Sequence, residues 1–174
     1  MERHYYKHNL KDGKKVKITK EHGTHSVKPS ASGKYFIDTY SSTDVANNVD
    51  IADAKGNFIK RLHEAVDPLK DYNIGTIELG ELKAEDGQTL YTRMIKPYNF
   101  DENKKYPVII YVYGGPHAQM ITDNWTADAG IYLHYLSQEG FIVFTLDNRG
   151  SADRGEAFEQ VIYLHFSWGH LFKE

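Results

Sequence analysis

Residues 107–116 read Pro-Val-Ile-Ile-Tyr-Val-Tyr-Gly-Gly-Pro, and they decide how the second half of the chain folds. The six apolar or aromatic residues at 108–113 predict a strand that is buried on both faces. The two glycines and the proline that follow end this strand sharply. A strand of this kind is typical of a parallel sheet, because helices cover both faces of such a sheet.

The sequence after this strand alternates between helix and strand patterns. Apolar residues at helical spacing predict a helix within 124–138, and Gly140 is the residue type that commonly follows a helix C-terminus. A second buried strand is expected over 141–146 and a further helix over 152–162. This order begins a mostly parallel α/β sheet. Because two strands make only part of such a sheet, we expect the domain to be incomplete.

The first half of the chain has a different pattern, in which short strand-like runs alternate with turns. Three dipeptides separate such runs: Asp12-Gly13, Lys55-Gly56 and Asp86-Gly87. Glycine in these places indicates tight hairpins, since it readily adopts a positive φ. Residues 64–71 are expected to form a loop or a short helical turn. The sequence therefore predicts a mixed fold, with an antiparallel β-sandwich or propeller blade first and an incomplete α/β domain after it.

The composition is that of an ordinary folded chain and excludes several classes of function. The 174 residues are 40% hydrophobic and 26% charged, with a formal net charge of −3 and no cysteine. Acidic and basic residues are interspersed, so we expect no nucleic-acid partner. No apolar run approaches the roughly 20 residues that cross a membrane. The absence of cysteine excludes disulfides and thiolate catalysis.

Several stretches together resemble one enzyme family. They are Ile37–Ser42, Ile95–Asp101, Val112–Pro116 and Asp147–Ala152, with Arg154-Gly155 and Phe158. This set resembles the prolyl oligopeptidase family of serine peptidases, and more closely its dipeptidyl peptidase IV branch. The resemblance implies that residues 1–75 are the last part of a β-propeller and that residues 76–174 begin an α/β-hydrolase catalytic domain. Residues 163–174 are atypical of the family.

The resemblance also implies an activity for a larger protein of which this chain would be a fragment. Members of the branch are serine exopeptidases that release N-terminal dipeptides, so peptides cleaved after proline or alanine are the expected substrates. The resemblance further implies a homodimer, a periplasmic or extracellular location and no cofactor. No residue here matches the acidic residues with which this family grips the amino terminus of its substrate.

Tyr113 is the candidate catalytic residue, because it ends the first buried strand and precedes Gly114 and Gly115. Acyl transfer places negative charge on a carbonyl oxygen, and a preorganised donor to that oxygen contributes roughly 3–4 kcal/mol. In α/β-hydrolases one such donor comes from the loop after an early strand. The resemblance implies that the Tyr113 hydroxyl is this oxyanion-hole donor. From the residues alone, a tyrosine packed at a strand end is the commoner interpretation.

The sequence lacks the nucleophile elbow Gly-x-Ser-x-Gly. Ser167 is the nearest candidate, but residue 165 is histidine and no strand precedes Ser167, so we reject it as a nucleophile. The Ser-Asp-His triad is then absent from this chain, and we expect the isolated chain to be inactive. The alternative is a non-catalytic binding or structural module derived from such a peptidase.

Asp147 and Arg149 follow the second buried strand, where α/β sheets place ligand contacts. A structural ion pair between them around a glycine turn is the preferred interpretation, and a substrate contact is the alternative.

The histidines are interpreted as scattered surface residues. His22 and His25 stand three apart, and His165 and His170 lie near the end of the chain. A zinc site needs three or four ordered ligands, and no cysteine or carboxylate cluster completes one here. We therefore expect no metal.

Overall fold

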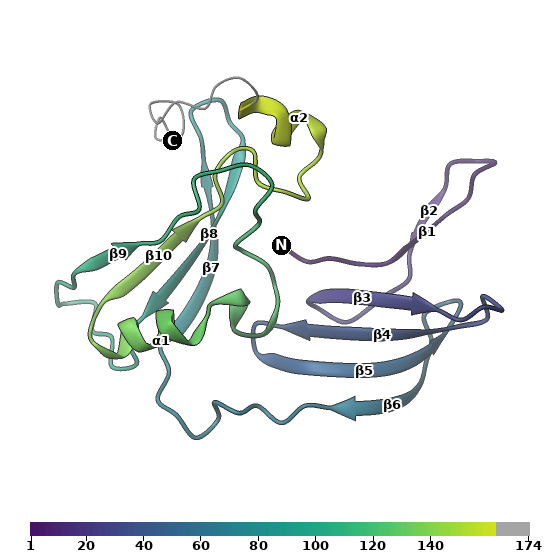
Figure 1. The fold of residues 1–174 in the computed structure, drawn as a ribbon, viewed down its shortest axis with the longest axis horizontal. Coiled ribbons are helices and arrows are strands. Elements are labelled where there is room, and N and C mark those ends of the chain that lie inside the picture. The colour runs from purple at the N-terminus through teal and green to yellow at the C-terminus, as the bar shows by residue number, and fades with distance from the viewer. Residues whose placement is uncertain (163–174) are drawn as a thin grey trace. The chain divides into compact units, whose positions relative to one another are not determined.

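The computed structural model describes residues 1–162, which form two compact units (Figure 1). The first unit comprises Met1–Asp71 together with Thr122–Asp128. The second comprises Tyr72–Ile121 and the residues from Ala129 onward. The sequence predicted a single boundary at 75/76, and it therefore did not foresee that the segment Thr122–Asp128 groups with the first unit.

The first unit is built from antiparallel hairpins. Its strands are β1 (Tyr6–His8), β2 (Lys15–Lys17), β3 (Thr24–Pro29), β4 (Tyr35–Ser42), β5 (Val45–Asp53) and β6 (Phe58–Glu64). β1 pairs with β2, and β3 to β6 form a four-stranded sheet in chain order. Gly13 and Gly56 have φ of 73° and 81°. The positive φ confirms the two hairpin turns expected there, because glycine adopts this conformation without steric cost.

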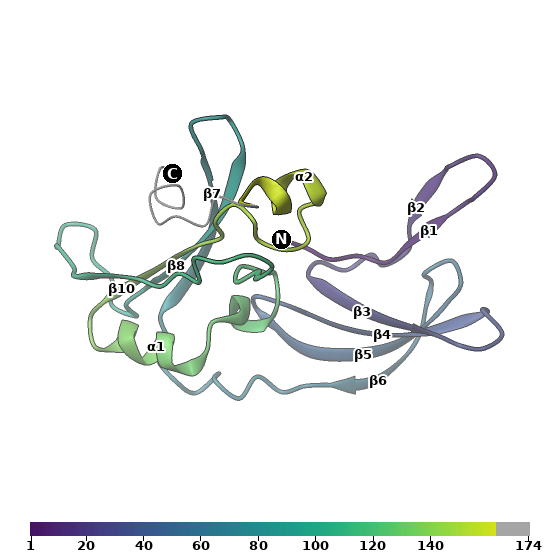
Figure 2. The ribbon, with the colours of Figure 1, turned by 45° about the horizontal axis from the view of Figure 1, so that its top comes forward.

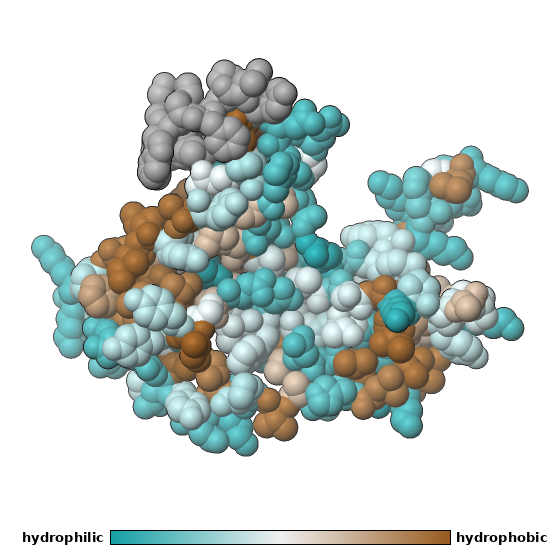
Figure 3. Space-filling view, in the orientation of Figure 1, coloured by the Kyte–Doolittle hydropathy of each residue, from teal (hydrophilic) through white to brown (hydrophobic). Residues whose placement is uncertain are grey.

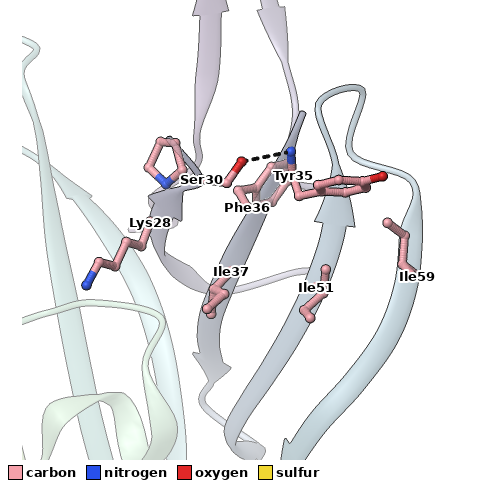
Figure 4. Close-up of a pocket in the computed structure, with 8 residues that line it drawn as sticks. Lys28, Ser30, Tyr35, Phe36, Ile37, Ile51 and Ile59 are labelled. Atoms are coloured by element: carbon pink, nitrogen blue, oxygen red, sulfur yellow. Dashed lines mark hydrogen bonds between the residues drawn. The ribbon is translucent and has the colours of Figure 1, made fainter. Parts of the chain in front are cut away.

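The four-stranded sheet of the first unit has two different faces. One face packs Phe36 and Ala52 against Ile18. A groove of about 660 Å³ also lies on the sheet (Figure 4). Ile37 and Ile59 line this groove and remain 40% and 50% exposed. The sheet therefore keeps an apolar surface that is only partly covered by the described residues.

The segment Thr122–Asp128 is held to the hairpin between β4 and β5. The backbone N–H and the hydroxyl of Thr43 both donate to Asp123 Oδ1, each at 2.9 Å. The predicted helix over 124–138 is wrong in its first part, since Trp125–Asp128 is a 3-10 turn with positive φ at three residues. The α-helix α1 spans only Ile131–Gln138. Contacts with the β4–β5 hairpin therefore override the helical spacing of this segment.

The second unit contains one sheet that mixes parallel and antiparallel pairs. Its strands are β7 (Thr76–Lys83), β8 (Thr89–Lys96), β9 (Val108–Ile110) and β10 (Ile142–Leu146), in the order β7-β8-β10-β9. The predicted parallel pair is confirmed, because Ile142 lies opposite Val108 in a parallel register. The predicted mostly parallel sheet is wrong for the described residues, since β8 pairs with both β7 and β10 in antiparallel fashion.

The helices of the second unit pack on this sheet. Leu133 of α1 joins Ile95 and Val143 in a buried cluster, and Figure 2 shows α1 beside the strands. The helix predicted over 152–162 forms only as α2 (Glu156–Glu159) and a 3-10 turn, Gln160–Ile162. Asp153 and Gly155 have φ of 62° and 89°. These positive φ values explain the late start, because they are incompatible with a right-handed helix.

Strand β9 is less buried than its apolar sequence predicts. It lies at an edge of the sheet, and Val108 and Ile110 are 56% and 67% exposed. Figure 3 shows apolar surface over this part of the second unit. The prediction that 108–113 is buried on both faces is therefore wrong for the described residues. An apolar edge with unpaired backbone groups is a template for pairing with another chain.

We expect the isolated chain to self-associate through β9. Replacing Val108 and Ile110 by lysine should weaken association at least about tenfold, since each buried apolar side chain contributes roughly 1.5–3 kcal/mol. Size-exclusion chromatography with light scattering measures the change. Leu10→Lys is the matched control, because Leu10 is 92% exposed and lies in the first unit. A wild-type chain that is monomeric at high concentration would contradict the expectation.

Candidate active-site loop

The candidate site lies in the second unit, at the carboxyl ends of the parallel strands β9 and β10. Such ends meet at one edge of a sheet, which is where α/β proteins place their ligands. The pairing continues beyond β9, since the Tyr111 N–H donates to the Phe144 carbonyl at 2.8 Å. Residues 112–121 then leave the sheet as a loop, which we call the Tyr113 loop. Its backbone turns at Gly114, where φ is 66°.

Tyr113 is 60% exposed and lies at the start of this loop. Its ring lies against the backbone of Gly115, because a Cβ at Gly115 would stand 2.8 Å from Tyr113 Cε1. A glycine at 115 therefore leaves room for the tyrosine ring. The hydroxyl makes no hydrogen bond within residues 1–162. A phenol O–H can donate one, so it can serve an external acceptor.

Asp147 holds the far end of the Tyr113 loop. Its two carboxylate oxygens accept hydrogen bonds from the backbone N–H groups of Met120 and Ile121, at 2.8 and 3.2 Å. Asp147 is only 3% exposed. Burial raises the pKa of its carboxyl above the ordinary value, although the two N–H donors and the charge of Arg93 act in the opposite direction.

The predicted ion pair of Asp147 with Arg149 differs from the contacts in the structure. Arg149 pairs with Asp86 in the turn between β7 and β8, while Asp147 binds the backbone of the Tyr113 loop. The Gly150 carbonyl beside it accepts the His117 N–H at 2.9 Å. The loop after β10 thus contacts the Tyr113 loop through both backbone and side chain.

Arg93 is a part of this site that the sequence did not reveal. It lies in β8, is 1% exposed, and donates from Nη1 to the Met120 carbonyl at 3.0 Å and from Nη2 to Thr145 Oγ1 at 3.2 Å. A single arginine in a strand is ordinarily an exposed residue. No sequence signal pointed to it, because β8 was grouped with the hairpins and its pairing with the strand expected over 141–146 was not foreseen.

The histidines of the first unit are not all on the surface. The side chain of His22 is 91% exposed, as predicted, and binds Glu2. His25 lies in β3 and is 5% exposed, so its interpretation as a surface residue is wrong. Its Nδ1 lies 2.9 Å from Asp38 Oδ2, and its ring stacks on Tyr40. Side chains alternate between the two faces of the sheet along β3, and that of His25 lies on the buried face. There its hydrogen bond to the carboxylate of Asp38 offsets the cost of burying the imidazole.

The remaining candidates are settled only in part. Ser167, His165 and His170 lie outside the described residues. Within residues 1–162, no group of three or more histidine, aspartate or glutamate side chains is placed to hold a metal ion. No helix in the same range is long and apolar enough to cross a membrane.

Comparison with known proteins agrees with the two halves of the chain. Residues 1–47 match the family model of the dipeptidyl peptidase IV N-terminal region, and residues 128–170 match that of the prolyl oligopeptidase family. The chain belongs to the prolyl oligopeptidase family. Its likeness within this family is to dipeptidyl peptidase IV, which confirms the resemblance seen in the sequence.

Relatives in this family match most of the chain. Dipeptidyl peptidase 4 of Arthroderma otae is 31% identical over 148 residues, which are 82% of this chain and 19% of that protein. Mouse dipeptidyl peptidase 8 is 29% identical over 157 residues, which are 84% of this chain and 17% of that protein. The chain therefore spans about a fifth of the length of the curated relatives it matches.

Solved structures of the family have the same fold. The crystal structure of a dipeptidyl aminopeptidase IV homologue from Bacteroides ovatus is 41% identical, with a TM-score of 0.83, over 90% of this chain and 23% of that chain. Dipeptidyl peptidase 4 of Porphyromonas gingivalis is 30% identical, with a TM-score of 0.82, over 93% of this chain and 23% of that chain. These likenesses confirm the predicted mixed fold class, with antiparallel β-sheet first.

Proposed function

We propose that this chain is part of a serine exopeptidase that releases N-terminal dipeptides, after proline or alanine, from peptide substrates. The observation that carries the proposal is the Tyr113 loop, which places an exposed phenol at the carboxyl end of a parallel strand in a member of this family. Within the proposal the whole enzyme is a homodimer, as the resemblance implies.

The two units have separate parts in this proposal. The first unit is the end of a β-propeller, which its four-stranded antiparallel sheet and its partly uncovered apolar groove support. The second unit is the start of an α/β-hydrolase domain. The parallel pair β9 and β10, with α1 between them in sequence and packed on the sheet, supports this assignment.

Tyr113 acts as an oxyanion-hole donor in this proposal. When the nucleophilic serine attacks the scissile carbonyl, negative charge grows on the carbonyl oxygen. The Tyr113 hydroxyl donates a hydrogen bond to that oxygen and stabilises the transition state more than the bound substrate. A phenol O–H is a hydrogen-bond donor, which is the role that this contact needs.

The 174-residue chain alone is proposed to be inactive. Its sequence contains no Gly-x-Ser-x-Gly elbow, so the serine, aspartate and histidine of the triad come from another part of the polypeptide. A donor without a nucleophile stabilises no acyl transfer step.

Hydrolysis of a chromogenic Gly-Pro substrate tests the proposal. The 174-residue chain should show no turnover and no labelling by a serine-reactive phosphonate. A longer polypeptide that carries this chain together with a nucleophile elbow should hydrolyse the substrate and should be labelled by the phosphonate. It should prefer Gly-Pro and Gly-Ala substrates over a Gly-Leu substrate. Turnover by the 174-residue chain that disappears in Ser167→Ala would overturn the proposed inactivity. An inactive longer polypeptide with an intact elbow would overturn the proposed activity.

A further inference from the structure

Met120 is held through both of its backbone polar groups. Its N–H donates to Asp147 at 2.8 Å, and its carbonyl accepts from Arg93 at 3.0 Å. Arg93 comes from β8, whereas Asp147 follows β10. These two strands are neighbours in the sheet, so the two hydrogen bonds anchor Met120 to the core of the second unit.

The two gripping side chains are charged and almost fully buried, at 1% exposed for Arg93 and 3% for Asp147. Burying such charges is costly, and apolar residues in their place are often as stable or more stable. A contribution to stability therefore explains poorly why Arg93 and Asp147 are buried here. Their hydrogen bonds to the backbone of Met120 and Ile121 give a stronger reason, because these bonds fix one end of a loop in which Tyr113 and His117 are exposed.

The surroundings of Arg93 favour a rigid guanidinium. Its Nη2 donates to Thr145, which is fully buried on β10. His134 of α1 lies nearby and is 2% exposed, and burial together with the charge of Arg93 lowers the pKa of its imidazole. His134 therefore stays neutral near pH 7 and adds no second positive charge beside Arg93.

Arg93 and Asp147, with their hydrogen bonds to the backbone of Met120, form what we call the clamp. A short stretch of the loop connects the clamp to Tyr113, and a backbone hydrogen bond holds this loop on either side of the tyrosine. Tyr111 is bound to β10 before the tyrosine, and His117 is bound to the Gly150 carbonyl after it. The Gly150 N–H in turn donates to the Phe158 carbonyl at 3.1 Å. Releasing Met120 would free the part of the loop that follows His117, and the tyrosine would move when this shift carries His117 with it.

We propose that Arg93 and Asp147 are positioning residues that hold the Tyr113 loop in the geometry for oxyanion stabilisation. They touch neither substrate nor reacting atoms and act through Tyr113. This inference rests on the proposed function of Tyr113. It adds the reason why the Tyr113 hydroxyl is held in place: a buried arginine and a buried aspartate both bind the backbone of Met120 in the same loop.

A double-mutant cycle in the longer polypeptide, with the Gly-Pro substrate, tests the inference. Arg93→Lys and Arg93→Met should each lower kcat about 10- to 100-fold and change KM less than about twofold, since a displacement near 1 Å costs up to about 100-fold. Lysine should not rescue the loss, because it lacks the planar fork that reaches Met120 and Thr145 together. In a Tyr113→Phe background the same changes should cost less than about threefold.

Several results would overturn the inference. Full activity in Arg93→Lys would show that charge balance alone matters, and equal losses with and without Tyr113 would show that Arg93 does not act through it. Arg61→Lys is the matched control, because Arg61 also pairs with an aspartate from a strand but lies in the first unit. Its kcat should equal that of the wild type.

Amide hydrogen exchange separates this inference from the proposed function. Arg93→Lys, Asp147→Asn and the milder Thr145→Val should each speed exchange across residues 112–121 at least about tenfold while the exchange of β7 stays unchanged, because the clamp hydrogen bonds open locally. If the wild type hydrolyses no dipeptide substrate, the proposed function fails, yet this exchange still tests the clamp. Unchanged exchange of residues 112–121 in all folded variants would overturn the clamp itself.

Discussion

Replacing Tyr113 by phenylalanine is expected to lower kcat for Gly-Pro substrates about 100- to 1,000-fold, with KM nearly unchanged. The substitution removes a single hydroxyl and keeps the ring that lies against Gly115. A donor that acts on charge developing in the transition state contributes little to substrate binding, so its loss falls on kcat. Steady-state kinetics of the longer polypeptide, with its secondary structure checked by circular dichroism, measure the effect.

Tyr111→Phe is the control for this prediction. Tyr111 stands two residues earlier and is 47% exposed, and it binds the sheet through its backbone, which phenylalanine preserves. Its kcat should stay within about twofold of the wild type, as an exposed hydroxyl away from the reaction contributes little. Equal losses of kcat in both variants would contradict an oxyanion role. So would a rise in KM with an unchanged kcat for Tyr113→Phe.

The hairpins of this chain were predictable because their signal is local. At Gly13, Gly56 and Gly87 the positive φ belongs to a turn of a few residues, and the residue type decides it. The parallel pairing of β9 with β10 was also predictable, since a strand–helix–strand order leaves few other arrangements. The family resemblance added the interpretation of Tyr113, which the residues alone did not favour.

The errors arise where distant residues decide the outcome. Trp125–Asp128 has helical spacing, but Thr43 donates a hydrogen bond to Asp123 and Ser41 accepts one from the Trp125 N–H, which holds this segment in the first unit. The Tyr113 loop depends on Arg93 and Asp147, which are 54 positions apart and meet only because β8 lies next to β10. His25 was taken as exposed because Asp38, its partner, becomes a neighbour only once β3 pairs with β4.

The second large effect is expected at His25 and Asp38. The Nδ1 of His25 lies 2.9 Å from Asp38 Oδ2, and its Nε2 lies 2.9 Å from the Glu21 carbonyl. Both partners present acceptor oxygens, and an imidazolium satisfies both of them because each of its ring nitrogens carries a proton to donate. Burial lowers the pKa of His25, but the hydrogen bonds to Asp38 and Glu21 outweigh it and raise the pKa above the ordinary 6.5.

Asp38→Asn is expected to lower the free energy of unfolding by about 3–5 kcal/mol at pH 6, because the buried imidazole loses the carboxylate that offsets its burial. Urea unfolding followed by tyrosine and tryptophan fluorescence measures this change. The lysine variant of Val108 and Ile110 is the suitable background, since we expect it to stay monomeric. His63→Gln is the control, because His63 is exposed on β6 and should leave the stability almost unchanged.

The pH dependence gives this prediction a second and sharper test. Since the folded pKa of His25 exceeds 6.5, its contribution to stability is fully present below pH 6.5 and is lost as the pH rises through the folded pKa. In Asp38→Asn the carboxylate is gone and burial remains, so the pKa of His25 falls and the sign reverses: stability then rises with pH up to about 6.5. The His25 contribution is isolated as the difference between each protein and its own His25→Gln variant. The same slope in both backgrounds would mean that Asp38 does not keep His25 charged.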